Sequence, residues 1–341
     1  MNVGMVLVAG FPYDIRVAKE ADALIQGGHD VFLLCIQRSA SEPSRENING
    51  IRVQRFCLRS SKLQHAAGML GWLVHRVGYT NPLWQAELSR FVERNRIDVL
   101  HLHDLQLARD VRFVARRMGI HYILDLHENY PYSIARTKKE ALPWWIPGSM
   151  YDLDRWLRYE AIECYHAHRI VVVCREMGER LVQRHGIPTE KVHIVENTVD
   201  LDGFDELPLH EDILQRFQGR YVIGYVGSCS LHRGVDTIIR AIPLVSQRIP
   251  NVLLLVVGDG PGLQEWKKLS TNLGVYPQQV AFEGYQPFSK VRSFIMASSV
   301  CTVPHEADDQ NNNGVPHKLY QYMACARPVL VSDCRSLKRI V

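Results

Sequence analysis

The chain has 341 residues, more than a typical single α/β domain requires, so two domains are the better expectation. Hydrophobic residues make up 46% of it, enough for two cores, and no apolar run reaches the length of a membrane span. The net charge of +4 is uneven, because residues 1–140 carry 19 Lys and Arg against 14 Asp and Glu. This basic half fits an anionic partner or an anionic membrane surface. No nucleic-acid-binding motif accompanies it, so we expect no nucleic-acid partner.

The eight cysteines form no C-x-x-C pair. Cys35, Cys174, Cys229 and Cys301 lie in or beside apolar runs, where a reduced thiol packs as a small hydrophobic group. This usage indicates a reducing compartment. The start of the chain shows neither a basic segment nor a cleavage-site pattern, so we expect no signal peptide. We therefore expect a cytoplasmic protein, with peripheral association at the inner face of the membrane as a further possibility.

In the first half of the chain, short apolar runs alternate with helical patterns. Many runs are apolar on both alternations, which is typical of strands buried on both faces of a parallel sheet. Val17, Ala21 and Leu24 form the apolar stripe of the helix that follows the first run, and Gly27 and Gly28 end it. The predicted strands cover residues 3–9, 31–36, 99–103, 122–126, 170–174 and 192–195.

The second half begins the same alternation again. Residues 197–219 are rich in Asp, Gly and Pro and have no sustained period. We therefore predict domains at residues 1–200 and 220–341, joined by a linker at 201–219. Strands are predicted at residues 221–227, 252–258, 300–303 and 329–332. The expected fold is α/β, with two doubly wound domains whose ligands bind beyond the carboxyl ends of the strands. The second domain looks short, so we expect the chain to lack its last part.

Polar residues follow three predicted strands of the first domain. Asp14 and Arg16 come after the first strand, where Asp14 either caps the next helix or faces a ligand. His127 and Glu128 follow the strand at 122–126. His127 is a candidate base, a donor to a hydroxyl group, or a structural histidine.

The sequence His101-Leu102-His103-Asp104 superficially suggests a metal site. His101 and His103 would point to one side of a strand. A third clustered ligand is absent, because Leu105 and Gln106 follow, so we expect no metal. The favoured interpretation is that His103 and Asp104 contact a ligand or each other.

Three segments of the second domain suit anion binding, and ordinary turns between strands and helices without a ligand are the equal alternative. Gly227 permits a tight turn after a strand, and Arg233 can reach a phosphate with its forked donors. Gly258 follows the next strand and suits a close approach of the backbone. Residues 311–324 predict a loop and a helix, and Lys318 adds a positive charge near the helix N-terminus. Leu319, Tyr322, Met323 and Ala326 are the predicted buried face of this helix.

Two segments have cations beside tryptophans, which suits an anionic bilayer interface. They are residues 59–76 and 136–147. Packing of both segments on the first sheet is the equal alternative.

Taken together, these motifs resemble family 4 of the retaining glycosyltransferases, which have the GT-B fold. The order and spacing of the motifs carry the resemblance through nearly the whole chain. It implies a nucleotide-diphosphate-sugar donor in the second domain, a glycan or lipid-linked acceptor at the first, and no metal or other cofactor. The acceptor side would include Asp14, Arg16, His103, Asp104 and Glu128. The donor site would include Gly227, Ser228, Arg233, Gly258, Gly284, Tyr285, Asn313, Gly314, Val315, His317, Lys318 and Gln321.

The resemblance also implies which residues are catalytic, and it shows where this sequence departs from the family's pattern. Arg233 and Lys318 would stabilise the departing diphosphate, and His127 would contact the donor sugar or position the acceptor. Asn313 and Gln321 stand where the family has two glutamates. Ser228 stands where arginine is frequent.

We therefore predict a glycosyltransferase that acts on a hydroxyl group of its acceptor. The replaced residues favour, as the alternative, a catalytically silent homologue that binds a nucleotide-sugar or a partner subunit. An epimerase of sugar nucleotides with the same fold is a further alternative. A nicotinamide-dependent dehydrogenase is disfavoured, because no G-x-G-x-x-G follows the first strand.

Overall fold

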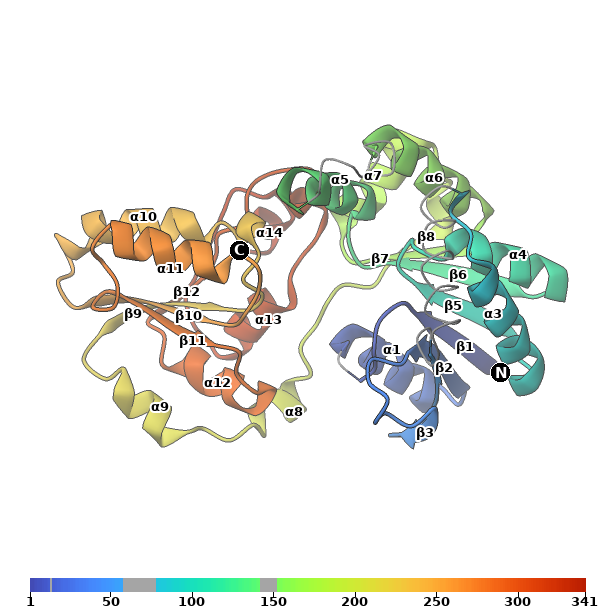
Figure 1. Ribbon diagram of the computed structural model, residues 1–341, viewed down its shortest axis with the longest axis horizontal. Coiled ribbons are helices and arrows are strands. Elements are labelled where there is room, and N and C mark those ends of the chain that lie inside the picture. The colour runs from blue at the N-terminus through green and yellow to red at the C-terminus, as the bar shows by residue number, and fades with distance from the viewer. Residues whose placement is uncertain (13, 58–77, 142–151) are drawn as a thin grey trace. The chain divides into compact units, whose positions relative to one another are not determined.

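A computed structural model describes residues 1–12, 14–57, 78–141 and 152–341 of the chain. It divides the chain into two compact units, Met1–Val195 and Glu196–Val341. Each unit has its own sheet with helices packed against it (Figure 1). The α/β fold class predicted from the alternating runs is confirmed.

The sheet of the first unit has the spatial order β3-β4-β2-β1-β5-β6-β7-β8. Its neighbouring strands are parallel except for β3, which is antiparallel to β4. The strands are β1 (Asn2–Leu7), β2 (Asp30–Ile36), β3 (Arg45–Ile48), β4 (Ile51–Phe56), β5 (Val99–His103), β6 (His121–Leu126), β7 (Arg169–Val172) and β8 (Val192–Ile194). All six strands predicted for this half are present, each within two or three residues of its predicted bounds.

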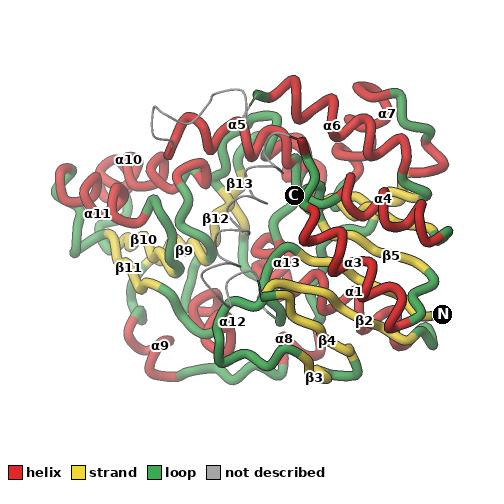
Figure 2. The backbone as a smooth tube through the Cα atoms, turned by 45° about the vertical axis from the view of Figure 1, so that its right-hand side comes forward, coloured by secondary structure: helices red, strands yellow, loops and turns green. Residues whose placement is uncertain are grey.

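Helices cover the first sheet, and Figure 2 shows them in red beside its yellow strands. They are α1 (Ile15–Gln26), α3 (Pro82–Asn95), α4 (Ala108–Met118), α5 (Tyr130–Ala141), α6 (Leu153–His166) and α7 (Arg175–His185). Helix α1 begins at its cap, because the Asp14 carboxylate accepts hydrogen bonds from the backbone N–H groups of Arg16 and Val17. Val17 and Ala21 of α1 pack into a core with Met5 and Leu33 of the neighbouring strands.

The second unit has a five-stranded parallel sheet of order β11-β10-β9-β12-β13. Its strands are β9 (Tyr221–Val226), β10 (Val252–Val257), β11 (Val280–Gly284), β12 (Val300–Val303) and β13 (Val329–Val331). Its helices are α8 (Leu201–Asp205), α9 (Glu211–Arg216), α10 (Val235–Ser246), α11 (Leu263–Asn272), α12 (Phe288–Met296), α13 (His317–Ala324) and α14 (Arg335–Ile340). Strand β10 is buried along its whole length and forms the centre of the core with Tyr225 and Trp266.

The sequence does not predict three of the observed strands. Strands β3 and β4 mix charged and apolar residues, and β11 lies at the edge of its sheet. The segment expected as a linker, residues 201–219, contains α8 and α9. Phe204 and Ile213 of these helices are buried, so the segment packs as part of the second unit. Two apolar residues in each short helix give too few turns for a helical period to show in the sequence.

The predicted buried face of α13 is half wrong. Leu319 and Tyr322 are buried, but Met323 is 46% exposed. Ala326 lies beyond the last residue of the helix and is also exposed. Lys318 is buried instead, which the functional site explains.

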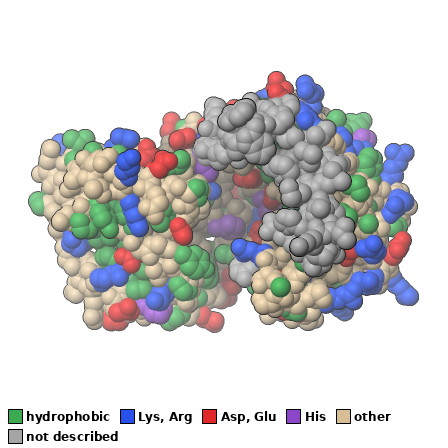
Figure 3. Space-filling model, viewed as in Figure 1, with side chains coloured by type: hydrophobic (Ala, Val, Ile, Leu, Met, Phe, Trp, Pro, Cys, Tyr) green, Lys and Arg blue, Asp and Glu red, His purple; other side chains and the backbone are tan. Residues whose placement is uncertain are grey.

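None of the helices in the described residues is long and apolar enough to cross a membrane. Lys, Arg, Asp and Glu side chains are spread over the face of each unit seen in Figure 3. The two segments expected to face a membrane, residues 59–76 and 136–147, fall outside the described residues, apart from the backbone of the end of α5 and the side chain of Arg136.

Candidate functional site

The carboxyl ends of β9 and β10 approach each other closely in the second unit. Gly227 and Gly258 follow these strands with φ of +146° and +142°. The Gly258 N–H donates to the carbonyl of Gly284, at the end of β11, over 2.8 Å. A Cβ atom on Gly258 would lie 1.9 Å from the Gly227 oxygen. Only glycine permits this contact between the turns.

Lys318 is buried beside these turns. It lies in the first turn of α13 and is 8% exposed. Its Nζ atom has no hydrogen-bond partner and lies 3.9 Å from the centre of the Tyr225 ring. A Cβ atom on Gly227 would lie 2.7 Å from that Nζ. The ammonium group therefore points at the turn after β9, where the face of the Tyr225 ring gives it a favourable cation–π contact.

A second cation lies close to Lys318. Arg233 follows the turn after β9, and its guanidinium Nη1 is 3.4 Å from Nε2 of His305. Its buried Nε has no hydrogen-bond partner. His305 follows β12 and is buried, and this burial, with Lys318 and Arg233 nearby, lowers its pKa far below the usual range. A neutral His305 can accept a hydrogen bond from Arg233.

These groups leave positive charge without a matching anion. Burial and the nearby Arg233 lower the pKa of Lys318 well below its usual range. Within the described part of the chain, neither Lys318 nor Arg233 is in an ion pair with a carboxylate. Buried cations without counter-ions are costly, and they mark sites that bind anions. The arrangement suits a diphosphate, since each phosphate can accept from a different cation.

The other residues expected at the donor site lie around this edge to different degrees. Val315 and Asn313 are buried in the loop before α13, and the Val315 carbonyl accepts a hydrogen bond from Asn197. Asn313 donates to the carbonyl of Asp309. Tyr285 is 77% exposed. Ser228, Gly284, Gly314, His317 and Gln321 are partly or fully exposed in the turns and in α13.

In the first unit, polar side chains gather at the carboxyl ends of β5 and β6. Asp125 is fully buried near the end of β6, and His127 follows it. His127 Nε2 lies 3.1 Å from both Asp125 Oδ2 and His103 Nδ1. The His127 backbone N–H donates to Asp104 over 3.2 Å. The structure thus brings together His103, Asp104 and His127.

His127 is held in a negatively charged environment. Its Nδ1 lies 3.9 Å from Asp104 and 4.0 Å from Asp14. Burial alone would lower the pKa of His127, but Asp104 and Asp125 raise it to about 9. The imidazolium is therefore the stable form at neutral pH. Such a group can donate to a hydroxyl group or an oxyanion, and it is a poor general base.

A residue that contacts an acceptor is expected to have an accessible side chain, but Arg16 and His103 are buried. Arg16 is 5% exposed, and its guanidinium binds the Asp125 carboxylate through Nη2 at 3.0 Å and Nε at 3.3 Å. It also donates to the Val195 carbonyl over 2.8 Å. His103 is fully buried. Neither side chain is open to a ligand; both hold the residues at the surface of the site. Asp14 caps α1, and Asp14, Asp104 and Glu128 are partly exposed.

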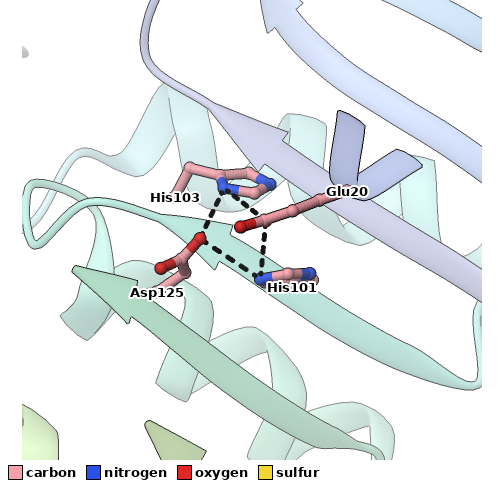
Figure 4. Close-up of side chains that lie close together, drawn as sticks. All are labelled: Glu20, His101, His103 and Asp125. Carbon is pink, nitrogen blue, oxygen red and sulfur yellow. Dashed lines mark ion pairs between the residues drawn. The ribbon is translucent and has the colours of Figure 1, made fainter. Parts of the chain in front are cut away.

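Four metal-ligating side chains converge behind His127. Glu20, His101, His103 and Asp125 place one ligand atom each within 4.8 Å of one another (Figure 4). The sequence predicts no metal because a third ligand near His101 and His103 is absent. The structure supplies Glu20 from α1 and Asp125 from β6, which no local spacing could show.

Sequence reasoning missed the roles of Glu20, Asp125, Tyr225 and His305. A local signal could have found Asp125, because it is a carboxylate inside an apolar strand. Glu20 lies one helical turn after Arg16, which is the spacing of an ion pair on a helix. Tyr225 and His305 carry no such signal, since their roles depend on contacts with Lys318 and Arg233.

Comparisons with known proteins agree with these observations. Residues 15–202 match the model of the glycosyltransferase family 4 and residues 220–341 match that of the glycosyl transferases group 1. An uncharacterised glycosyltransferase of Methanocaldococcus jannaschii is 23% identical, over 94% of this chain and 76% of its own length. D-inositol 3-phosphate glycosyltransferase of Xylanimonas cellulosilytica is 24% identical, over 96% and 76%.

Solved structures share the fold. Sucrose-phosphate synthase of Thermosynechococcus elongatus has a TM-score of 0.74 at 16% identity, covering 100% of this chain and 83% of its own. HepE of Anabaena, solved in complex with UDP, has a TM-score of 0.70 at 14% identity, with the same coverage. The fold is therefore GT-B, with two Rossmann-like domains, and the chain belongs to glycosyltransferase family 4.

Proposed function

We propose that this glycosyltransferase moves a sugar from a nucleotide-diphosphate-sugar to a hydroxyl group of a glycan or lipid-linked acceptor, with retention of configuration at the anomeric carbon. The observation that carries the proposal is the pair of cations at the carboxyl edge of the second sheet, Lys318 and Arg233, which have no carboxylate partner in the described part of the chain. HepE, of the same fold, has been solved with UDP and with UDP-glucose, which supports a nucleotide-sugar donor.

The cations would act where charge develops. Departure of the diphosphate builds negative charge on its oxygens, and Lys318 and Arg233 would stabilise that charge more strongly than the charge of the bound donor. The glycine turns at Gly227 and Gly258 would let the backbone approach the phosphates. Two cations can neutralise the diphosphate, so we propose that the donor needs no metal ion.

The first unit would contribute the acceptor side. His127 would donate a hydrogen bond to the sugar or the acceptor, held by Asp125 and Asp104. Asp14, Asp104 and Glu128 are the partly exposed acidic groups at this edge, and they suit acceptor hydroxyls. We further propose that the protein is cytoplasmic and that its lipid-linked or glycan acceptor lies at the membrane surface.

Binding of the donor is tested first, in the absence of any acceptor. The full chain is heated with UDP, GDP, ADP and their sugars, and one diphosphate should raise the melting temperature by mass action. Binding at unchanged affinity with and without Mg²⁺ or Mn²⁺ is the expected result for a metal-free donor site. If no nucleoside diphosphate shifts melting or binds by calorimetry, the donor site is wrongly assigned.

Turnover separates the alternatives. The donor that binds is incubated with glycan and polyprenyl-phosphate-linked acceptors, and products are followed by mass spectrometry. A glycosylated acceptor with the donor's anomeric configuration supports the proposal. Conversion of the donor sugar without any acceptor would identify an epimerase. Tight binding of the donor without turnover on any acceptor would favour a catalytically silent homologue. Asn313 and Gln321, which replace the two glutamates of the family, are the reason to consider that alternative.

A further inference from the structure

The cluster behind His127 consists of Glu20, His101, His103 and Asp125, and two of its potential metal-ligating atoms take part in no hydrogen bond with a described residue. Nε2 of His101 and Oε2 of Glu20 are buried, and neither has a hydrogen-bond partner among the residues that the structure describes. His101 is 8% exposed, and Figure 4 shows its Nε2 directed at the carboxylates of Glu20 and Asp125. Both distances are 3.7 Å, which is too long for a hydrogen bond. Buried polar atoms without partners require an explanation, and an ion between them is one.

The spacing of the four atoms fits one small cation. His103 Nδ1 lies 3.3 Å from Asp125 Oδ2 and 3.8 Å from Glu20 Oε2. With His101 at 3.7 Å from each carboxylate, the four atoms form a closed ring. A tetrahedral zinc ion with ligands at about 2.0–2.2 Å has edges of roughly 3.3–3.6 Å between ligand atoms. Four of the six distances between these atoms therefore lie within a few tenths of an ångström of such edges, and all six are within 4.8 Å.

Arg16 supports each carboxylate from outside the ring. Its Nη2 donates a hydrogen bond to the outer oxygen of Asp125, Oδ1, at 3.0 Å, and forms an ion pair with the outer oxygen of Glu20, Oε1, at 2.8 Å. The inner oxygens face the histidines, although Arg16 Nε also lies 3.3 Å from Asp125 Oδ2. Carboxylates that bind a metal through one oxygen typically have the other held by a hydrogen-bond donor.

We propose that Glu20, His101, His103 and Asp125 bind a divalent transition-metal ion, with Zn²⁺ as the best match. Two imidazoles and two carboxylates favour such ions over Mg²⁺ and Ca²⁺, which take oxygen ligands. The ion would join α1, β5 and β6 at the edge where His127 lies. It would also fix Asp125, whose Oδ2 is 3.1 Å from His127 Nε2.

This site is independent of the proposed donor site, because it rests on the first unit alone. It departs from the sequence-based expectation of no metal, which considered only neighbouring residues. Its test therefore measures the binding of a metal ion rather than the transfer of a sugar. The proposal of a metal-free donor site and the proposal of an ion behind His127 are independent, so an experiment can contradict one of them and leave the other intact.

The experiment uses the full chain without an affinity tag. The protein is stripped with a chelator, dialysed, and titrated with Zn²⁺ against a chromophoric chelator; one equivalent should bind. Zn²⁺ should raise the melting temperature, whereas Mg²⁺ and Ca²⁺ should not. His101→Gln and Glu20→Gln should each lower zinc affinity at least about 100-fold, the upper end of what loss of an outer partner costs.

A matched control lies on the same strand as Asp125. His121, at the opposite end of β6, is exposed and contacts His168 rather than the cluster. His121→Gln should keep wild-type zinc affinity. Co²⁺ should give a visible tetrahedral spectrum without a thiolate charge-transfer band, since no cysteine is among the four residues.

Two results would overturn the proposal. One is binding of well under one equivalent of Zn²⁺ or Co²⁺ by the wild-type protein. The other is the same zinc affinity in the His101→Gln and Glu20→Gln variants as in His121→Gln, with all three folded by circular dichroism. In either case the four residues form a hydrogen-bonded cluster only.

Discussion

Lys318 is the buried side chain on which the proposed diphosphate site depends most. Its ammonium group meets the Tyr225 ring and the glycine turn, while burial and Arg233 lower its pKa. A bound diphosphate would stabilise the charged form and raise the pKa again. At a pH between these two pKa values, binding must therefore take up a proton.

Calorimetry can measure this uptake. At about pH 8.5, well below the pKa of an ordinary lysine near 10.4, the apparent enthalpy of UDP binding should depend on the ionisation enthalpy of the buffer. Lys318→Met should weaken binding and abolish the dependence, whereas Lys268→Met, an exposed lysine on α11, should change neither. A buffer-independent enthalpy in the wild-type protein would show that Lys318 does not titrate on binding.

Arg233 should contribute to the same site as a charged hydrogen-bond donor. Arg233→Ala should weaken diphosphate binding by about 1.5–3 kcal/mol, as expected for a hydrogen bond to a charged group. Arg240→Ala is the control, because Arg240 is exposed on α10 and pairs only loosely with Asp236, at 3.9 Å. Equal affinity of both variants and the wild type would remove Arg233 from the site.

Gln321 tests the departure from the family pattern. It lies one turn after Lys318 on α13, at a position where the resemblance implies a carboxylate that accepts from the donor's hydroxyls. Gln321→Glu should tighten binding of the preferred nucleotide diphosphate by about 1 kcal/mol, because the new hydrogen bond would be charge-assisted. Weaker binding would mean that the amide N–H is needed here, and the assignment of Gln321 as a ribose contact should be dropped.

At the scale of elements, the turns after β9 and β10 depend on each other. Gly258→Ala would place a methyl group 1.9 Å from the Gly227 oxygen at φ of +142°. Strain and overpacking together should lower the free energy of unfolding of the second unit by about 3 kcal/mol or more. Gly219→Ala, where φ is +77° and the space is open, should cost about 1–2 kcal/mol. Urea unfolding followed by far-ultraviolet circular dichroism compares them, and equal losses would contradict the close approach.

The sequence predicted the central strands well and the edges poorly. Strands β5 and β12 lie inside their sheets and match their predicted bounds at every residue. Strand β4 was missed because Arg52, Gln54 and Arg55 interrupt its apolar residues, and Arg55 is nevertheless buried among ion-pair partners. Ion pairs between distant residues leave no period in the sequence, so such strands emerge only from the tertiary structure.

The residues of the two candidate sites could likewise be predicted only in part from the sequence. Gly227, Arg233, Lys318 and His127 follow strands or open helices, so their placement could be predicted from order along the chain. The cluster that supports His127 could not be predicted, because its members come from three elements. Whether a polar residue faces a ligand or supports another side chain depends on burial, and Arg16 and His103 proved to be enclosed.

For the whole molecule, the two proposed sites predict two separate patterns of protection. A ligand that binds only the folded state stabilises the amides that must open together with its site, by about 2.7 kcal/mol at a hundredfold excess over Kd. UDP should therefore slow hydrogen exchange most at the ends of β9 and β10 and at the start of α13. Zn²⁺ should slow exchange most in α1 and at the carboxyl ends of β5 and β6. Lys318→Met should remove the first pattern and keep the second, and His101→Gln should do the reverse. Protection by UDP centred on β5 and β6, or unchanged protection by Zn²⁺ in the His101→Gln variant, would show that the ligands bind elsewhere.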